Sequence, residues 1–170
     1  MQSPTLVDAG RVTLAYETFG SPDDPPLVLV MGVATQMLAW PDRFCQRLAD
    51  AGFHVVRFDN RDIGLSTHLD DAGVPDLMAL LTGEGGSAPY LLADMADDTA
   101  ALFDALGLDR VHLVGLSMGG MIVQEVALRH GHRLASLTSI MSTPAATVGQ
   151  PTPEAQAVLL APSVTTAEQA

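Results

Sequence analysis

The sequence has few basic residues. Its eight basic residues, all arginines, stand against 20 acidic residues, which gives a formal net charge of −12. Such a charge repels phosphate backbones and anionic lipid head groups, so neither a nucleic acid nor a membrane is an expected partner. The acidic residues are spread along the chain rather than gathered as the dense oxygen ligands of a hard cation. We therefore interpret them as a solvated surface and predict no metal site.

Cysteine and long apolar runs are also scarce. Cys45 is the one cysteine, so the chain cannot form an intramolecular disulfide or a thiolate metal cluster. No segment approaches the roughly 18 uninterrupted apolar residues of a membrane helix. The first residues lack the basic start and apolar run of a signal peptide. Together these absences predict a cytoplasmic protein.

The residues that are present predict alternating strands and helices around one core. With 48% hydrophobic residues among 170, the chain fits a single compact domain. Residues 11–19 alternate between apolar and polar side chains, as in a half-buried outer strand. Short apolar runs predict further, buried strands at 27–31, 54–59, 111–116 and 134–141. Apolar residues at three- and four-residue spacing predict helices from about residue 40 to Gly52, from Leu92 to Gly107 and from Gly119 to Arg129.

This order of elements predicts the α/β class, with a mostly parallel central sheet flanked by helices. Right-handed crossovers between parallel strands place helices on both faces of such a sheet. The functional site of these sheets lies at the carboxyl ends of the strands. Residues 67–90 form a long irregular stretch, and beyond Ser142 the chain becomes rich in proline before a weakly helical segment at 154–161.

One motif carries chemistry: Gly115-Leu116-Ser117-Met118-Gly119 follows a predicted buried strand and opens a predicted helix. This is the context of a G-x-S-x-G nucleophile elbow, which presents a serine hydroxyl for attack. Side chains at Gly115 and Gly119 would collide with neighbouring backbone, and Gly120 would let the helix lie close to the sheet. The positive end of that helix would also lie beneath the developing negative charge.

Two other interpretations of the motif compete with the elbow. A plain strand-to-helix turn with a capping serine needs no chemistry, and the five residues alone do not exclude it. A dinucleotide-binding turn needs glycine at the middle position of G-x-G-x-x-G, where the backbone approaches the pyrophosphate. Ser117 stands at that position, so we reject the dinucleotide interpretation.

Acyl transfer also needs two N–H donors directed at the oxyanion. The residue after the nucleophile, here Met118, supplies one of them. We expect the other from the loop Val30-Met31-Gly32-Val33, which follows the first central strand. Gly32 would let the backbone face the serine, and the amide of Val33 is our candidate donor.

Four blocks of sequence carry a family resemblance: Val30-Met31-Gly32, Trp40-Pro41, Arg57 to Ser66, and Gly115 to Gly120. Over residues 6–145 they resemble the α/β-hydrolase superfamily and, within it, the aclacinomycin methylesterase-like group. The resemblance implies a cofactor-free esterase or related hydrolase that acts on a small-molecule ester through an acyl-enzyme at Ser117. It also implies ion-pairing or capping roles, rather than catalysis, for Asp59, Arg61 and Asp62. Many relatives have His-Gly where this chain has Met31-Gly32.

The sequence does not complete a catalytic triad. A serine nucleophile needs a histidine base and an acid that orients it, in the chain order nucleophile, acid, histidine. Downstream of Ser117, Glu125 would lie about 12 Å away along the helix, and His130 farther still. His54 and His112 begin strands and so belong to the opposite end of the sheet. His68 alone falls in a loop on the same side, where it could approach the serine or face solvent.

The last strands of the family have no counterpart in this sequence. We therefore expect residues 1–143 to form the N-terminal part of an α/β-hydrolase core, and residues 144–170 to begin a cap. The final strands and most of the cap would be missing. An exposed last strand favours pairing with another chain, so we expect a homo-oligomer or a complementary C-terminal fragment as partner. Two functions stay open: a serine esterase, with carbon–carbon bond hydrolysis or perhydrolysis as variants, and a catalytically silent scaffold.

Overall fold

The computed structural model describes residues 4–73, 88–144, 148–149 and 152–159. Its centre is a six-stranded sheet in the order β1-β2-β4-β3-β5-β6. The strands are β1 (Thr5–Asp8), β2 (Thr13–Phe19), β3 (Pro26–Val30), β4 (His54–Phe58), β5 (Val111–Leu116) and β6 (Leu134–Ile140). β1 and β2 are antiparallel to their neighbours, whereas β4, β3, β5 and β6 run parallel. The predicted mostly parallel sheet is confirmed.

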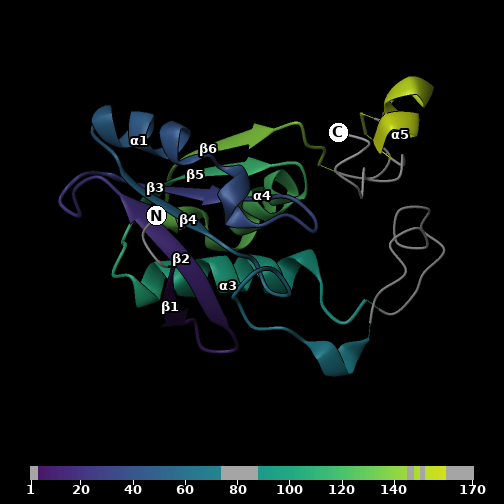
Figure 1. Ribbon diagram of the computed structural model, residues 1–170, viewed down its shortest axis with the longest axis horizontal. Coiled ribbons are helices and arrows are strands. Elements are labelled where there is room, and N and C mark those ends of the chain that lie inside the picture. The colour runs from purple at the N-terminus through teal and green to yellow at the C-terminus, as the bar shows by residue number, and fades with distance from the viewer. Residues whose placement is uncertain (1–3, 74–87, 145–147, 150–151, 160–170) are drawn as a thin grey trace, which may run out of the picture.

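Helices cover both faces of this sheet (Figure 1). They are α1 (Asp42–Asp50), α3 (Leu92–Ala105) and α4 (Met118–His130), while α5 (Pro153–Leu159) lies beyond the arrowheads of β5 and β6. Three short 3₁₀ turns complete the described elements: η1 (Met37–Ala39), η2 (Asp70–Ala72) and η3 (Gly131–Arg133). None of the described helices is long and apolar enough to span a membrane.

Two apolar clusters fill the spaces between the sheet and its helices. Along β3, Val28 and Val30 pack into the cluster that α3 and α4 cover, and Leu27 and Leu29 pack into the cluster beside α1. Successive residues of a strand point to opposite faces, so a strand covered on both sides needs apolar residues at every position. This explains the uninterrupted apolar run that predicted the central strand.

The structure corrects two predictions about the elements. β2 is not the outermost strand, because β1 pairs with it from Thr5 opposite Tyr16 to Asp8 opposite Thr13. The first helix, which was expected to have Pro41 as its first helical residue, begins at Asp42 after an extended Pro41. The predicted helical segment at 154–161 is present as α5, and its residues from 160 onward lie outside the described part. Residues 74–87 of the long irregular stretch, and most of the predicted cap start at 144–170, also lie outside it.

β6 is the last strand on its side of the described sheet. It pairs in parallel with β5 from Leu134 to Ile140, and no other described strand pairs with it. Four of its seven residues are exposed, namely Ala135, Ser136, Thr138 and Ser139. Its outer edge therefore offers backbone N–H and C=O groups to a further strand.

Candidate active site

Ser117 lies on the turn between β5 and α4, in a backbone conformation that few residues adopt. Its φ is 56° and its ψ is −123°. Such a conformation costs on the order of 1–3 kcal/mol in a residue with a side chain, and it recurs where a functional side chain must be held in place. The Ser117 N–H donates to the carbonyl of Ile140 at 2.9 Å, which ties the turn to the end of β6.

Three glycines permit this turn, as the sequence predicted. A β-carbon at Gly115 would collide with the backbone of Gly119, and one at Gly119 would collide with the carbonyl oxygen of Val30. A β-carbon at Gly120 would collide with Ser142, beyond the end of β6. The first turn of α4 therefore lies directly against β3, β5 and the end of β6.

The loop after β3 lies beside the serine. A β-carbon at Gly32 would be 3.1 Å from Cβ of Ser117 and 3.5 Å from its Oγ. The next residue, Val33, is 44% exposed. Met118 is the first residue of α4, and the first N–H groups of a helix have no partner within it. The two candidate donor residues thus lie on the two backbone segments that flank Ser117.

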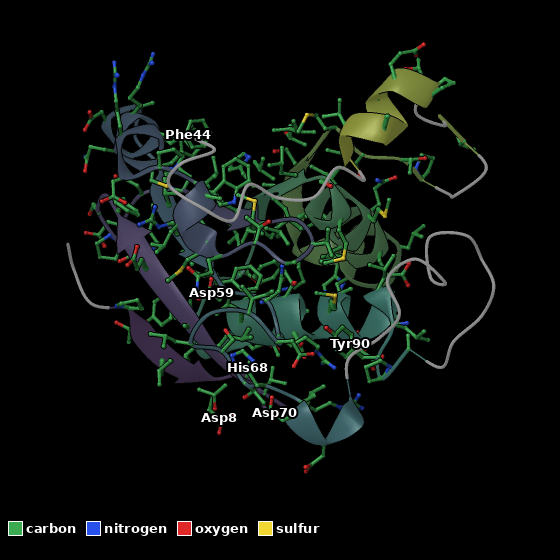
Figure 2. All side chains as sticks on the ribbon, turned by 45° about the vertical axis from the view of Figure 1, so that its right-hand side comes forward. Asp8, Phe44, Asp59, His68, Asp70 and Tyr90 are labelled. Carbon is green, nitrogen blue, oxygen red and sulfur yellow. The ribbon has the colours of Figure 1, made fainter. Side chains whose placement is uncertain are left out.

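Two buried polar residues contact the ends of this loop from the end of β4. Asn60 Nδ2 donates to the carbonyl of Met31 at 3.0 Å. Asp59 Oδ1 accepts the N–H of Met37 at 2.7 Å, and its Oδ2 accepts that of Leu65 at 3.3 Å. Burial raises the pKa of Asp59 above its ordinary value, although the two N–H donors act in the opposite direction. Figure 2 shows Asp59 on the stretch that follows β4.

Other members of the same stretch have the structural roles that the sequence predicted. Arg61 forms a buried two-pronged ion pair with Asp98 of α3, at 2.6 and 2.7 Å. Asp62 accepts the N–H of Leu69 at 2.6 Å. The role of Arg57 in β4 was not predicted: its side chain is buried and bonds to Glu17, Asp42 and the carbonyl of Trp40. An arginine inside an apolar strand run was the signal for it.

None of the five histidines, all within the described residues, forms a hydrogen bond with Ser117 in this structure. His54 and His112 lie near the amino ends of β4 and β5, and His112 Nδ1 contacts Ser136 Oγ at 2.8 Å. His130 Nε2 contacts Asp97 at 2.8 Å. The exposed His68 contacts the carbonyl of Gly64 at 3.1 Å. The remaining one, His132, is exposed in η3.

The described residues offer no evident place for a metal. No group of three or more histidine, cysteine, aspartate or glutamate side chains among them could hold one. Cys45 is free and lies on the buried side of α1, and its burial raises the pKa of the thiol. A buried thiol of raised pKa carries little thiolate, so it is a poor second nucleophile. Ser117, on its strained turn, therefore stays the candidate nucleophile among the described residues.

A parallel sheet that presents a serine on a strained turn between a strand and a helix is the arrangement of the α/β-hydrolase class. Residues 25–161 match the family model described as alpha/beta hydrolase fold. The chain belongs to this family, as the sequence resemblance implied.

Curated relatives of this chain include several hydrolases. A rhodomycin D methylesterase from Streptomyces sp. (strain C5) is 36% identical over 136 residues, which are 80% of this chain and 41% of the relative. A putative carbamate hydrolase from Variovorax paradoxus is 32% identical over 127 residues, 75% of this chain and 41% of the relative. This chain therefore spans about two fifths of the length of these relatives.

Solved structures agree with the family assignment. A hydrolase from Pseudomonas aeruginosa PA01 superposes with a TM-score of 0.67 at 29% identity, over 93% of this chain and 53% of that one. The enol-lactonase from Burkholderia xenovorans LB400 superposes with a TM-score of 0.65 over 81% of this chain and 46% of that one. At 24% identity, this second likeness supports the fold alone.

Proposed function

We propose that this chain supplies the nucleophile and the oxyanion hole of a serine hydrolase that acts on carboxylic esters. The observation that carries the proposal is the backbone of Ser117, with its φ of 56° between β5 and α4, directly beside Gly32. A merely capping serine would not require this strained conformation. The methylesterase among the relatives favours an ester of a small molecule as substrate.

In the proposed reaction, Ser117 Oγ attacks the ester carbonyl carbon and gives its proton to a base. The oxyanion that forms accepts hydrogen bonds from the amides of Val33 and Met118. Collapse of this intermediate breaks the bond to the alcohol, which leaves with the proton, and an acyl-serine remains. Water then releases the acid and restores Ser117. Each oxyanion donor is typically worth about 100- to 1,000-fold in turnover.

The described residues place no general base beside Ser117. We propose that it comes with a complementary C-terminal fragment or a longer form of the protein, whose strands would pair with the open edge of β6. In that arrangement residues 144–170 would begin a cap over the site. No described residue argues for a bound cofactor, and the proposed reaction requires none.

The test is covalent labelling of Ser117 by a fluorophosphonate, followed by peptide mass spectrometry. We expect one adduct on the peptide that contains Ser117, and none in Ser117→Ala. Hydrolysis of a p-nitrophenyl ester, compared in the same two proteins, measures turnover. Absence of labelling in a form that carries a complete triad would contradict the proposed function.

A second candidate function is a catalytically silent scaffold. The observation in its favour is the placement of the histidines, since His130 bonds to Asp97 and His68 to Gly64. Without a base, an oxyanion hole and binding alone leave a rate only about 1,000- to 10,000-fold above that of water in serine proteases. Full turnover that depends on Ser117 in this 170-residue chain would exclude the scaffold.

A further inference from the structure

We propose that Asp59 and Asn60 are positioning residues that hold the oxyanion loop, residues 31–37, at both of its ends. This inference rests on the proposed function, because it assigns a role to the loop that carries Val33. The two side chains stand next to each other at the end of β4, which is the direct neighbour of β3 in the sheet. They touch the first and the last residue of the loop.

The first attachment fixes the point where the loop leaves β3. Asn60 is 3% exposed, and its Nδ2 donates to the carbonyl of Met31, the residue directly before Gly32. Asparagine carries both a donor and an acceptor, whereas aspartate of the same shape carries acceptors alone when it is ionised. A carboxylate at this position would face the Met31 carbonyl with a second acceptor and would repel it.

The second attachment fixes the far end of the loop. Asp59 is 4% exposed, and its two oxygens accept the N–H groups of Met37 and Leu65, one on each side. Gly64 lies so close that a β-carbon there would collide with the carboxylate. The Asp59 side chain thus has little room to change its position, and Met37 is fixed with it.

Between these attachments the described hydrogen bonds of the loop are local. Thr35 Oγ1 donates to the carbonyl of Val33 at 2.8 Å, a local bond that does not tie the loop to the sheet. Ala34 has a φ of 50°, a left-handed conformation that is strained in a residue with a side chain. A strained segment relaxes when its ends are freed, so the direction of the Val33 amide would depend on Asp59 and Asn60.

The expected consequence is a loss in the chemical step rather than in substrate binding. A catalytic group has to be held within about 0.5 Å of its productive position. A donor that is turned away from the oxyanion no longer stabilises the transition state more than the ground state, so the rate of the chemical step falls. Loss of one donor lowers turnover by about 100- to 1,000-fold. A loosened loop should cost part of this, about 10- to 100-fold.

The central variant is Asn60→Asp, which keeps the shape of the side chain and removes the donor. We expect the fluorophosphonate labelling rate of Ser117 to fall by about 10- to 100-fold, as part of the effect of a lost donor. The deficit relative to the unmodified protein should shrink as the pH is lowered, because a protonated carboxyl group can again donate to the Met31 carbonyl. Protonation would also relieve the cost of burying a carboxylate, so urea unfolding at each pH shows whether the recovery of labelling goes beyond the recovery of the fold.

The matched control is Leu102→Ala in α3, a fully buried residue far along the chain from the loop. This truncation lowers stability through a cavity and leaves the loop contacts intact. Urea unfolding of both variants then separates loss of fold from loss of positioning. A labelling rate in Asn60→Asp equal to that in Leu102→Ala at similar stability would overturn the proposal.

A second measurement does not depend on activity at all. The backbone amide resonances of Gly32 and Val33 should shift in Asn60→Asp and in Asp59→Asn, and they should stay in place in Leu102→Ala. Unchanged resonances in the two loop variants would overturn the positioning role even if labelling falls. Shifted resonances in a form that carries a complete triad and still never labels would support the loop attachment and contradict the proposed function instead.

Discussion

Gly119, at the start of α4, lies directly against the carbonyl oxygen of Val30, at the end of β3. A β-carbon at Gly119 would collide with this oxygen and would also come within 2.7 Å of the carbonyl oxygen of Met31. Backbone cannot move aside as the end of a flexible side chain can. The helix that follows the proposed nucleophile, Ser117, is therefore in contact with the strand that leads to the proposed oxyanion loop.

The variant Gly119→Ala should lower the free energy of unfolding by about 1–3 kcal/mol, the usual cost of forcing an extra group into a packed interior. Urea unfolding measures this loss. The control is Gly131→Ala, because a β-carbon at Gly131 would meet no atom within 4 Å and its φ of −55° suits any residue. Equal unfolding midpoints for the two variants would contradict the close approach at Gly119.

The strain at Ser117 predicts a stability difference between two variants that lack its hydroxyl group. Glycine adopts a φ near 56° without strain, whereas alanine keeps the β-carbon that opposes it. Relief of this strain should make the free energy of unfolding of Ser117→Gly about 1 kcal/mol higher than that of Ser117→Ala. The greater backbone freedom of glycine in the unfolded chain offsets part of this difference. Thermal or urea unfolding of the two variants measures this difference. A more stable alanine variant would argue against a strained turn at Ser117.

The ion pair between Arg61 and Asp98 joins the loop after β4 to α3, and the two side chains are 7% and 6% exposed. Arg61→Met leaves the Asp98 carboxylate buried without its partner, which typically costs about 3–5 kcal/mol. The double variant Arg61→Met/Asp98→Leu should recover part of this loss, since it buries no charge. Urea unfolding of the three proteins gives the comparison.

The control for this prediction is Arg129→Ala, which breaks the exposed pair between Arg129 and Asp97. Solvent screens charges at such positions, so we expect a much smaller loss of stability there. A double variant no more stable than Arg61→Met would show that packing, rather than the unpaired charge, dominates at this position.

His54 should make stability depend on pH. Burial lowers the pKa of His54 below 6.5, while the charge of Asp24 opposes this, and its buried Nδ1 has no hydrogen-bond partner among the described residues. Below pH 6.5 the unfolded chain then binds more protons at this residue than the folded one. The stability it contributes is present above that pH and is lost as the pH falls through the folded-state pKa.

Urea unfolding from about pH 7.5 to pH 5, across the range in which histidine titrates, measures this effect. We expect the loss on acidification to be smaller in His54→Gln, which has no titrating group at that position. The same substitution at the exposed His132 serves as the reference. An identical pH dependence in the protein and in His54→Gln would refute the prediction.

Much of the fold could be predicted because its signals are local. The apolar run that became β3 and the three- and four-residue spacing that became α3 each reflect burial against a neighbour. β1 gave no such signal, since it is four residues long and its Leu6 is 56% exposed at the edge of the sheet. That missing strand is the reason why β2 was expected to be the outer one.

The turn at Ser117 was predictable for a similar reason: its glycines lie within six residues of one another, and the steric demands of a tight turn are local. The contacts that hold the oxyanion loop were not. Asn60 and Met31 are 29 residues apart in sequence, and a side-chain bond to backbone over that separation leaves no periodic pattern. Arg57 was missed likewise, because its partner Glu17 is 40 residues away.

The two faces of the sheet differ in the size of the buried apolar cluster that packs against each of them. The cluster beneath α3 and α4 draws residues from most of the described strands, whereas the one beneath α1 is smaller. Regions with fewer buried apolar contacts open first in local fluctuations of a native protein. We therefore expect the backbone amides of α1 to exchange their hydrogens with solvent faster than those of α4, the helix that follows Ser117.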